Sequence, residues 1–139
     1  MKALVIILLT VSFSSNCQNI IGTWKRTSTI LEHTNGKTDD MQKNLLAGMP
    51  CIADIKYVFE SNGKHTMILS KGCEGIPSTV ATWKMSGDTF SISQKLGNEV
   101  VNTTYELSFA GNIMTMTHNY TAADKTPDMK RIVLKYQKL

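Results

Sequence analysis

The stretch that decides the fold reads Trp83-Lys84-Met85-Ser86-Gly87-Asp88-Thr89-Phe90-Ser91-Ile92. Two runs that alternate apolar and polar residues flank a tight turn at Gly87, a pattern typical of a β-hairpin. Residues 105–116 repeat the arrangement, with an aromatic-led run, a glycine turn at Gly111 and a Thr-containing alternation. A third turn, Ser61-Asn62-Gly63, joins another pair of such runs. Successive hairpins predict an antiparallel meander.

Outward from this hairpin, period-two alternation is frequent beyond residue 18 and helical periodicity is scarce. One segment, Asp39–Ala47, is predicted to be helical, because paired acids open it and Gly48 and Pro50 follow as stop signals. Asp39 and Asp40 are interpreted as charges that complement the helix dipole, not as a catalytic pair. The predicted strands are Ile20–Leu31, Cys51–Glu60, Lys64–Ser70, Thr79–Met85, Thr89–Ser93, Val100–Phe109, Asn112–Tyr120 and Lys130–Lys138.

These elements predict an all-β fold, an eight-stranded antiparallel up-and-down barrel with one short helix after the first strand. Closing a meander into a barrel removes its two unpaired edges, and eight strands leave room for side chains or one small ligand. A Greek-key sandwich of similar strand count is the alternative. The barrel is favoured because the short hairpins leave few long crossovers.

The chain has 139 residues, which is enough for one domain of this kind. Its net charge of +4 comes from scattered basic residues, so no nucleic-acid partner is expected. Residues 1–17 resemble a secretory signal, with Lys2 before an apolar run too short to span a membrane. The barrel domain is expected over residues 18–139. Cys17 is a candidate lipidation site, and cleavage without lipid is the alternative.

The remaining cysteines are Cys51 and Cys73. In an exported protein thiols tend to pair, and these two can meet at one end of a hairpin, so a disulfide is predicted and two free buried thiols are the alternative. Export would place the protein in the periplasm, on the outer membrane or outside the cell. A membrane contact is expected only through the lipid anchor, and no protein partner is indicated.

The succession Gly22-Thr23-Trp24-Lys25, then Cys51, then Asn62-Gly63, then Cys73, then Trp83 and Gly87-Asp88 resembles the small lipocalin-like domains exported by bacteria. The resemblance covers residues 19–139. It implies that Trp24 lies across the closed end of the barrel and that Gly22 allows a close backbone approach. It also implies that a basic residue near the end of the last strand packs on the indole, with Arg131 and Lys135 as the candidates.

Alternation assigns one face of each strand to the interior, which predicts a lumen suited to a small hydrophobic molecule. A solid core without a cavity is the alternative. The residues predicted to line the ligand site are Tyr57, Phe59, Met67, Trp83, Met85, Phe90, Tyr105, Leu107 and Met116.

No common catalytic motif is present in the sequence, and we expect neither an enzyme nor a cofactor. The hypotheses are a carrier or sensor of a small hydrophobic ligand, a structural or protein-binding envelope module with a filled barrel, and a periplasmic Cu(I)-binding module. The copper alternative rests on Met114, Met116 and His118, which share one face of a strand and have soft ligand atoms. His65 and Met67 are similarly spaced on another strand. Plain apolar alternation explains this stripe better, so no metal site is predicted.

Overall fold

The computed structural model describes residues 19–77 and 80–139. The signal-like segment, Cys17 and Thr79, the first residue of one predicted strand, lie outside the described residues. In chain order the elements are β1 (Gly22–His33), β2 (Thr38–Asp40), α2 (Met41–Gly48), η1 (Pro50–Asp54), β3 (Lys56–Phe59), β4 (Lys64–Ile68), β5 (Val80–Ser86), β6 (Thr89–Leu96), β7 (Glu99–Ala110), β8 (Ile113–Asn119), η2 (Ala122–Asp124) and β9 (Met129–Lys138).

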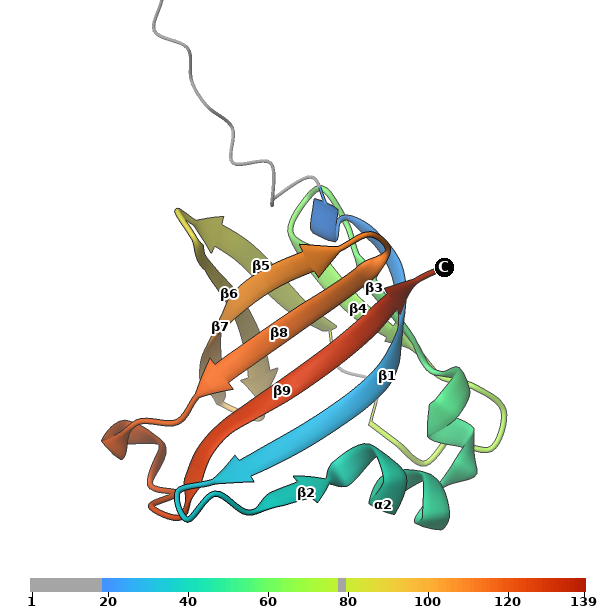
Figure 1. Cartoon of the computed structure of the whole chain (residues 1–139). Helices are drawn as coiled ribbons and strands as arrows, with labels where there is room; N and C mark the ends of the chain where they lie inside the picture. Colours follow the sequence, from blue (N-terminus) through green and yellow to red (C-terminus); the bar gives the residue numbers. More distant parts are fainter. Residues whose placement is uncertain (1–18, 78–79) are drawn as a thin grey trace, which may run out of the picture.

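The strands form one antiparallel sheet that follows the order of the chain and closes on itself (Figure 1). The closing pair is β1 with β9, from Trp24 opposite Lys138 to His33 opposite Met129. Eight strands make the barrel, and β2 is a three-residue extra strand that pairs with the end of β1 beyond its contact with β3. The predicted up-and-down barrel is therefore confirmed, and the sandwich alternative is wrong because β1 and β9 leave no open edge between them.

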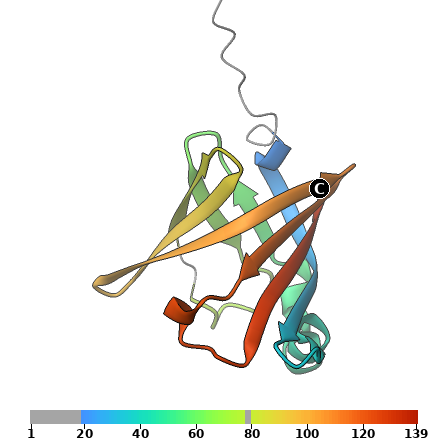
Figure 2. The same cartoon turned by 60° about the vertical axis from the view of Figure 1, so that its left-hand side comes forward.

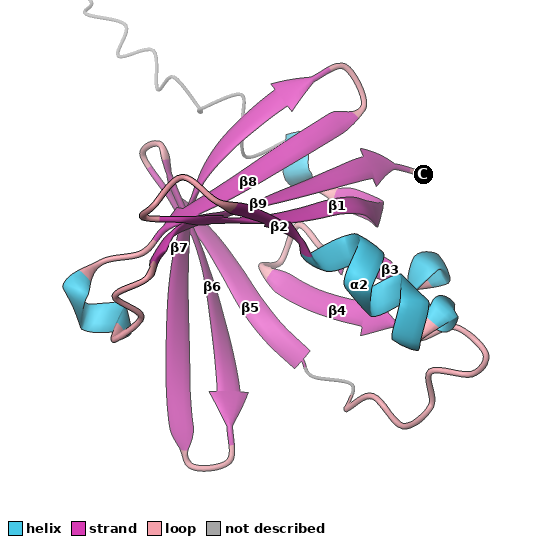
Figure 3. Cartoon of the chain, turned by 60° about the horizontal axis from the view of Figure 1, so that its bottom comes forward, coloured by secondary structure: helices cyan, strands magenta, loops and turns pink. Residues whose placement is uncertain are grey.

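The short helix α2 follows the first long strand, as predicted, but it begins later than expected. Asp40 is its N-cap, and its carboxylate accepts a hydrogen bond of 2.9 Å from the Lys43 backbone N–H. Asp39 lies in β2, so its assignment to the helix start is wrong. The helix packs against β1 and η1 (Figure 3). Among the described residues, no helix has the length and apolar character needed to cross a membrane.

Most strand boundaries lie within two residues of the sequence prediction, and the largest differences are in β3 and β6. Pro50–Asp54 is a 3₁₀ turn, and β3 begins only at Lys56, because Pro50 favours a helical first turn and lacks an N–H for a sheet ladder. β6 and β7, in turn, continue beyond Ser93, with Leu96 still paired to Glu99. The β6–β7 hairpin consequently projects from the barrel (Figure 2).

Trp24 is 1% exposed, and its indole Nε1 donates a hydrogen bond of 2.8 Å to the Ile20 carbonyl. Lys138 places its ammonium 5.3 Å from the ring centroid, a cation–π contact. Gly22 adopts a φ of +136°, and a Cβ there would lie 3.0 Å from the Lys138 side chain. Glycine is favoured at this position because its φ is one that other residues rarely adopt.

The basic residue over Trp24 is thus Lys138, and neither Arg131 nor Lys135. The register explains the difference, because Lys138 is the residue opposite Trp24, whereas Arg131 lies opposite Glu32. Arg131 Nη2 donates a hydrogen bond of 2.8 Å to Glu32 at the far end of the strand pair. Its assignment to the closed end is wrong.

Cys51 and Cys73 form a disulfide with their Cα atoms 5.7 Å apart, as the sequence predicted. The bridge joins η1 to the connection between β4 and β5. In the same connection, Ser70 Oγ donates a hydrogen bond of 2.5 Å to the Cys51 carbonyl. This disulfide is consistent with an exported protein.

Candidate ligand site

A cavity of about 210 Å³ lies inside the barrel. Every one of the eight barrel strands contributes to its wall, so it is the lumen itself and not a groove between loops. We call it the barrel cavity. Its lining residues are Arg26, Tyr57, His65, Met67, Ala81, Ile92, Gln94, Val101, Thr103, Tyr105, Met116, Leu134 and Tyr136.

Four of the nine predicted ligand residues line this cavity, namely Tyr57, Met67, Tyr105 and Met116. The other five do not. Phe59, Trp83 and Phe90 pack on one another, with ring centroids 6.0 to 6.3 Å apart. Met85 and Leu107 are partly buried against the same core.

The lumen is therefore divided into two parts. The packed half contains Trp24, Phe59, Trp83, Phe90 and Met114, each at most 7% exposed and none of them in the cavity wall. The hollow half consists of the residues that line the barrel cavity. The predicted lumen and its alternative, a filled core, each describe one half of the barrel.

Arg26 is the cation of the hollow half. It is partly buried, and its guanidinium carbon lies 4.5 Å from the ring centroid of Tyr57 and 5.2 Å from that of Tyr136. Its Nε and Nη2 both donate to the Tyr136 hydroxyl, at 3.1 and 2.9 Å. The two tyrosine rings meet edge to face, with centroids 5.3 Å apart. Stacking and hydrogen bonding together hold the guanidinium in one position.

Tyr136 is 3% exposed, and burial raises its pKa to about 12, with Arg26 opposing the rise. Its hydroxyl is therefore protonated at any ordinary pH. While its oxygen accepts the two Arg26 N–H groups, its own O–H remains a donor. Burial also raises the pKa of Tyr105 across the cavity.

His65 is neutral in this setting. Burial lowers its pKa, and the backbone hydrogen bond to Val58 only partly offsets that effect. Because a carbonyl can only accept, the Nδ1 atom 3.0 Å from the Val58 oxygen carries the proton. The ring also stacks on Phe59, with centroids 4.1 Å apart. Arg26 is consequently the one charged side chain among the residues that line the cavity.

A second cavity of about 190 Å³ adjoins the first and is bounded by α2 and η1. We call it the α2 cavity. It shares Arg26, Tyr57 and Met67 with the barrel cavity, so these three side chains border both spaces. The helix is fixed in place by Gln42, which is 8% exposed and accepts a hydrogen bond of 3.1 Å from Thr29 Oγ1.

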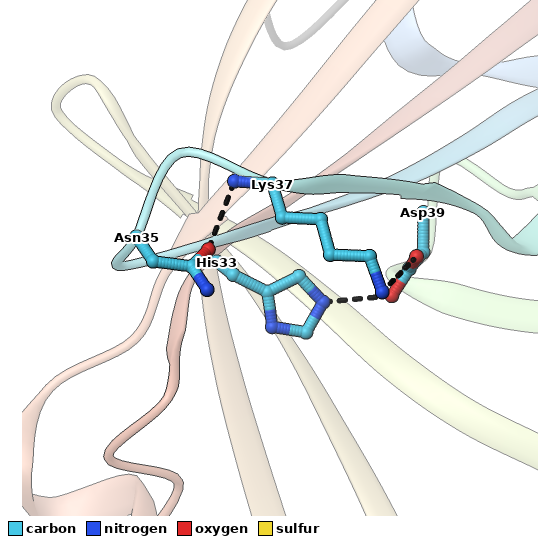
Figure 4. Close-up of polar contacts among 4 residues, drawn as sticks. All are labelled: His33, Asn35, Lys37 and Asp39. Carbon is cyan, nitrogen blue, oxygen red and sulfur yellow. Dashed lines mark hydrogen bonds and ion pairs between the residues drawn. The ribbon is translucent and has the colours of Figure 1, made fainter.

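The turn between β1 and β2, just ahead of α2, carries a polar cluster (Figure 4). His33 Nε2 lies 2.7 Å from Asp39 Oδ2, and Lys37 Nζ lies 3.5 Å from the other carboxylate oxygen. Asn35 Oδ1 accepts a hydrogen bond of 2.9 Å from the Lys37 backbone N–H. The bond from His33, together with the nearby Lys37 charge, holds the pKa of Asp39 below its usual range despite some desolvation.

A family model described as a domain of unknown function, DUF5004, matches residues 8–129. The chain belongs to the DUF5004 family. No curated protein and no solved structure matches it. The match runs from the N-terminal segment to Met129, so it includes seven of the eight barrel strands and only the first residue of β9, the strand that closes the barrel.

Sequence reasoning did not include Arg26 and Tyr136 among the site residues of this DUF5004 domain. The signal was available, because alternation from Trp24 places Arg26 on the same inward face of β1. A β-bulge between Arg26 and Ser28 then shifts the alternation, so that Thr29 and Leu31 point inward farther along the strand. The signal in the sequence is a charged residue on the inward face of a strand, two positions after Trp24.

Of the residues of the copper alternative, His65, Met67 and Met116 line the barrel cavity of this DUF5004 domain, whereas Met114 and His118 do not. Met114 and Met116 are 0% and 1% exposed within the core, and of the two only Met116 reaches the cavity wall. His118 Nδ1 donates 2.8 Å to the Thr104 carbonyl, and its Nε2 lies 3.6 Å from Asp124. Within residues 19–77 and 80–139, no group of three or more His, Cys, Asp or Glu side chains is placed to hold a metal ion.

Proposed function

We propose that this protein is an exported, lipocalin-like binding protein that holds a small, partly apolar molecule in the hollow half of its barrel and performs no reaction on it. The observation that carries the proposal is the barrel cavity, whose wall is built by all eight strands. A space enclosed by a closed sheet keeps its shape without a ligand, which reduces the ordering entropy that binding must overcome.

The lipocalin-like character is supported by the closed antiparallel meander, by Gly22-x-Trp24 at the start of β1 and by the Lys138 ammonium over the indole. Export is supported by the Cys51–Cys73 disulfide and by the signal-like leader. In this proposal the membrane is met only through a lipid on Cys17, and nucleic acid is not a partner.

The second candidate is a structural or protein-binding envelope module. The packed half favours it, because Trp24, Phe59 and Phe90 fill that part of the lumen completely at 0 to 1% exposure. A module whose barrel serves only as a stable core would need no more than this.

A cavity-filling variant separates the two candidates. Ala81 is 5% exposed and lines the barrel cavity, so Ala81→Phe should fill it, whereas Thr82→Phe on the outer face of the same strand should not. Calorimetric titration of the disulfide-bonded protein with small amphipathic molecules should give saturable binding that Ala81→Phe abolishes and Thr82→Phe retains. Binding to none of a broad panel, or binding untouched by Ala81→Phe, would favour the structural module.

A further inference from the structure

The charge on Arg26 has no counterpart in the protein. All eleven acidic side chains of the sequence lie in the described part of the chain, and none is hydrogen bonded to Arg26 or within ion-pair distance of it. The chain's other arginine, Arg131, is paired with Glu32. A desolvated charge without a partner is costly, so an unpaired guanidinium in a lumen wall needs a reason.

The Arg26 guanidinium also carries more N–H donors than the Tyr136 hydroxyl accepts. A guanidinium carries five N–H groups, of which Nε–H and one Nη2–H are directed at the Tyr136 hydroxyl. In residues 19–77 and 80–139 the remaining N–H groups have no hydrogen-bonded protein acceptor, and neither does the Tyr136 O–H. Both residues line the barrel cavity, so these donors border the space in which a ligand would lie.

The composition of the wall sets the charge of that ligand. Neither the barrel cavity nor the α2 cavity is lined by an acidic residue, and His65 is neutral. One negative charge would neutralise Arg26, whereas a dianion would leave a net charge buried in the lumen. A planar carboxylate also matches the fork of the guanidinium.

The rest of the wall sets the body of the ligand. Five apolar side chains, those of Met67, Ile92, Val101, Met116 and Leu134, form most of the remaining wall, and Gln94 and Thr103 add polar groups to it. A volume of about 210 Å³ is below the usual range for drug-sized pockets. The body is therefore apolar and short.

We propose that the lumen binds a small monocarboxylate with a short apolar body, and that its carboxylate accepts hydrogen bonds from Arg26 and the Tyr136 hydroxyl. This inference rests on the proposed function and specifies its ligand class. The tyrosine rings on Arg26 keep the guanidinium in place before the ligand arrives, so little ordering is needed on binding.

The test uses calorimetric titration of the disulfide-bonded protein with octanoate, with octanamide as the neutral isostere and with octyl phosphate as the dianion. Octanoate should bind at least tenfold more tightly than octanamide, the difference expected for hydrogen bonds to a charged group, and also more tightly than octyl phosphate. Arg26→Met should remove the preference for octanoate over octanamide. Arg131→Met, at the arginine outside the cavities, should leave it unchanged. Arg26→Gln serves as a second neutral variant if Arg26→Met does not fold, and the comparison of ligands on the parent protein needs no variant.

The outcomes separate this inference from the proposed function. Equal binding of octanoate and octanamide, both lost in Ala81→Phe, would overturn the carboxylate inference and keep the lumen as a binding site. Tighter binding of octyl phosphate would overturn it in favour of a phosphate ligand. Binding of none of the three molecules to the parent protein would overturn the inference, and the further absence of binding across the broader panel would overturn the function as well.

Discussion

The packed and hollow halves of the barrel arise from the same strands and the same alternation, yet they are built differently. In the packed half, Trp24 and Phe90 are at most 1% exposed, and each lies against other aromatic rings. In the hollow half, Arg26, Tyr57 and Tyr136 line a cavity with polar groups directed at one another. The first arrangement favours stability through close packing, and the second keeps space and donors at the expense of packing.

A single strand contributes to both halves within a few residues. On β1, Trp24 belongs to the packed half and Arg26 to the hollow half, one alternation step away. On β3 the same step separates Phe59 from Tyr57. If the packed half serves stability and the hollow half serves binding, a substitution at an inward position of the packed half should lower stability. A substitution at the next inward position, in the hollow half, should instead weaken binding.

The largest effect should come from deleting a ring in the packed half. Trp24→Ala should lower the free energy of unfolding by about 3 to 5 kcal/mol, because a large buried side chain leaves a cavity and loses its contacts. Tyr105→Ala, which enlarges an existing cavity, should have a clearly smaller effect. Urea unfolding followed by circular dichroism measures both. Equal losses in the two variants would remove the distinction between the halves.

Removing the disulfide should come next. The double variant Cys51→Ser, Cys73→Ser should lose about 3 kcal/mol, since the bridge restricts a loop of this size in the unfolded chain. The bridge anchors η1 beside the α2 cavity, so hydrogen exchange should rise in η1 and α2 and stay low around Trp24. A loss below about 1 kcal/mol, or faster exchange in the packed half, would contradict this role.

Arg26→Met should change the free energy of unfolding by only about 1 kcal/mol or less in either direction. The variant loses two hydrogen bonds and the contacts with the tyrosine rings, but it also removes an unpaired, partly buried charge. The same urea titrations provide the measurement. A loss as large as that of Trp24→Ala would show that Arg26 serves stability before binding.

The smallest effect concerns the His33–Asp39 contact at the turn into α2. The pKa of Asp39 is held low in the folded protein, so its contribution is present above the unfolded pKa of about 3.9 and is lost as the pH falls through the folded value. The stability difference between the parent and Asp39→Asn should therefore shrink as the pH falls from about 5 to below about 4. Thermal unfolding across this range tests it, and a difference that did not shrink there would refute the contact.

The fold could be predicted from the sequence because hairpin turns such as Gly87 and Gly111 fix the partner of each strand locally. The candidate site was harder to predict. Phe59, Trp83 and Phe90 satisfy the same alternation as Tyr57 and Met116, and only the tilt and register of the strands decide which of them pack on one another. Lys138 was missed for the same reason, because its place over Trp24 depends on the β1–β9 register.

Sequence periodicity also does not predict the β-bulge in β1 or the 3₁₀ turn η1. The bulge follows Arg26 and changes which later residues of β1 face inward, and nothing in Thr27 or Ser28 marks it. Pro50 did mark the end of the helix, but the turn that it begins takes the place of the first half of a predicted strand. Both features depend on how distant segments pack, which a local pattern does not contain.

The central claim is that binding occurs in the hollow half alone, and the methionine methyl groups test it most directly. Met67 and Met116 line the barrel cavity, whereas Met114 is 0% exposed in the packed half. In a titration with octanoate, the ¹³C-labelled methyl signals of Met67 and Met116 should shift saturably and that of Met114 should stay in place. Saturable shifts at Met114 with none at Met67 and Met116, or no shift at any of the three, would contradict the account.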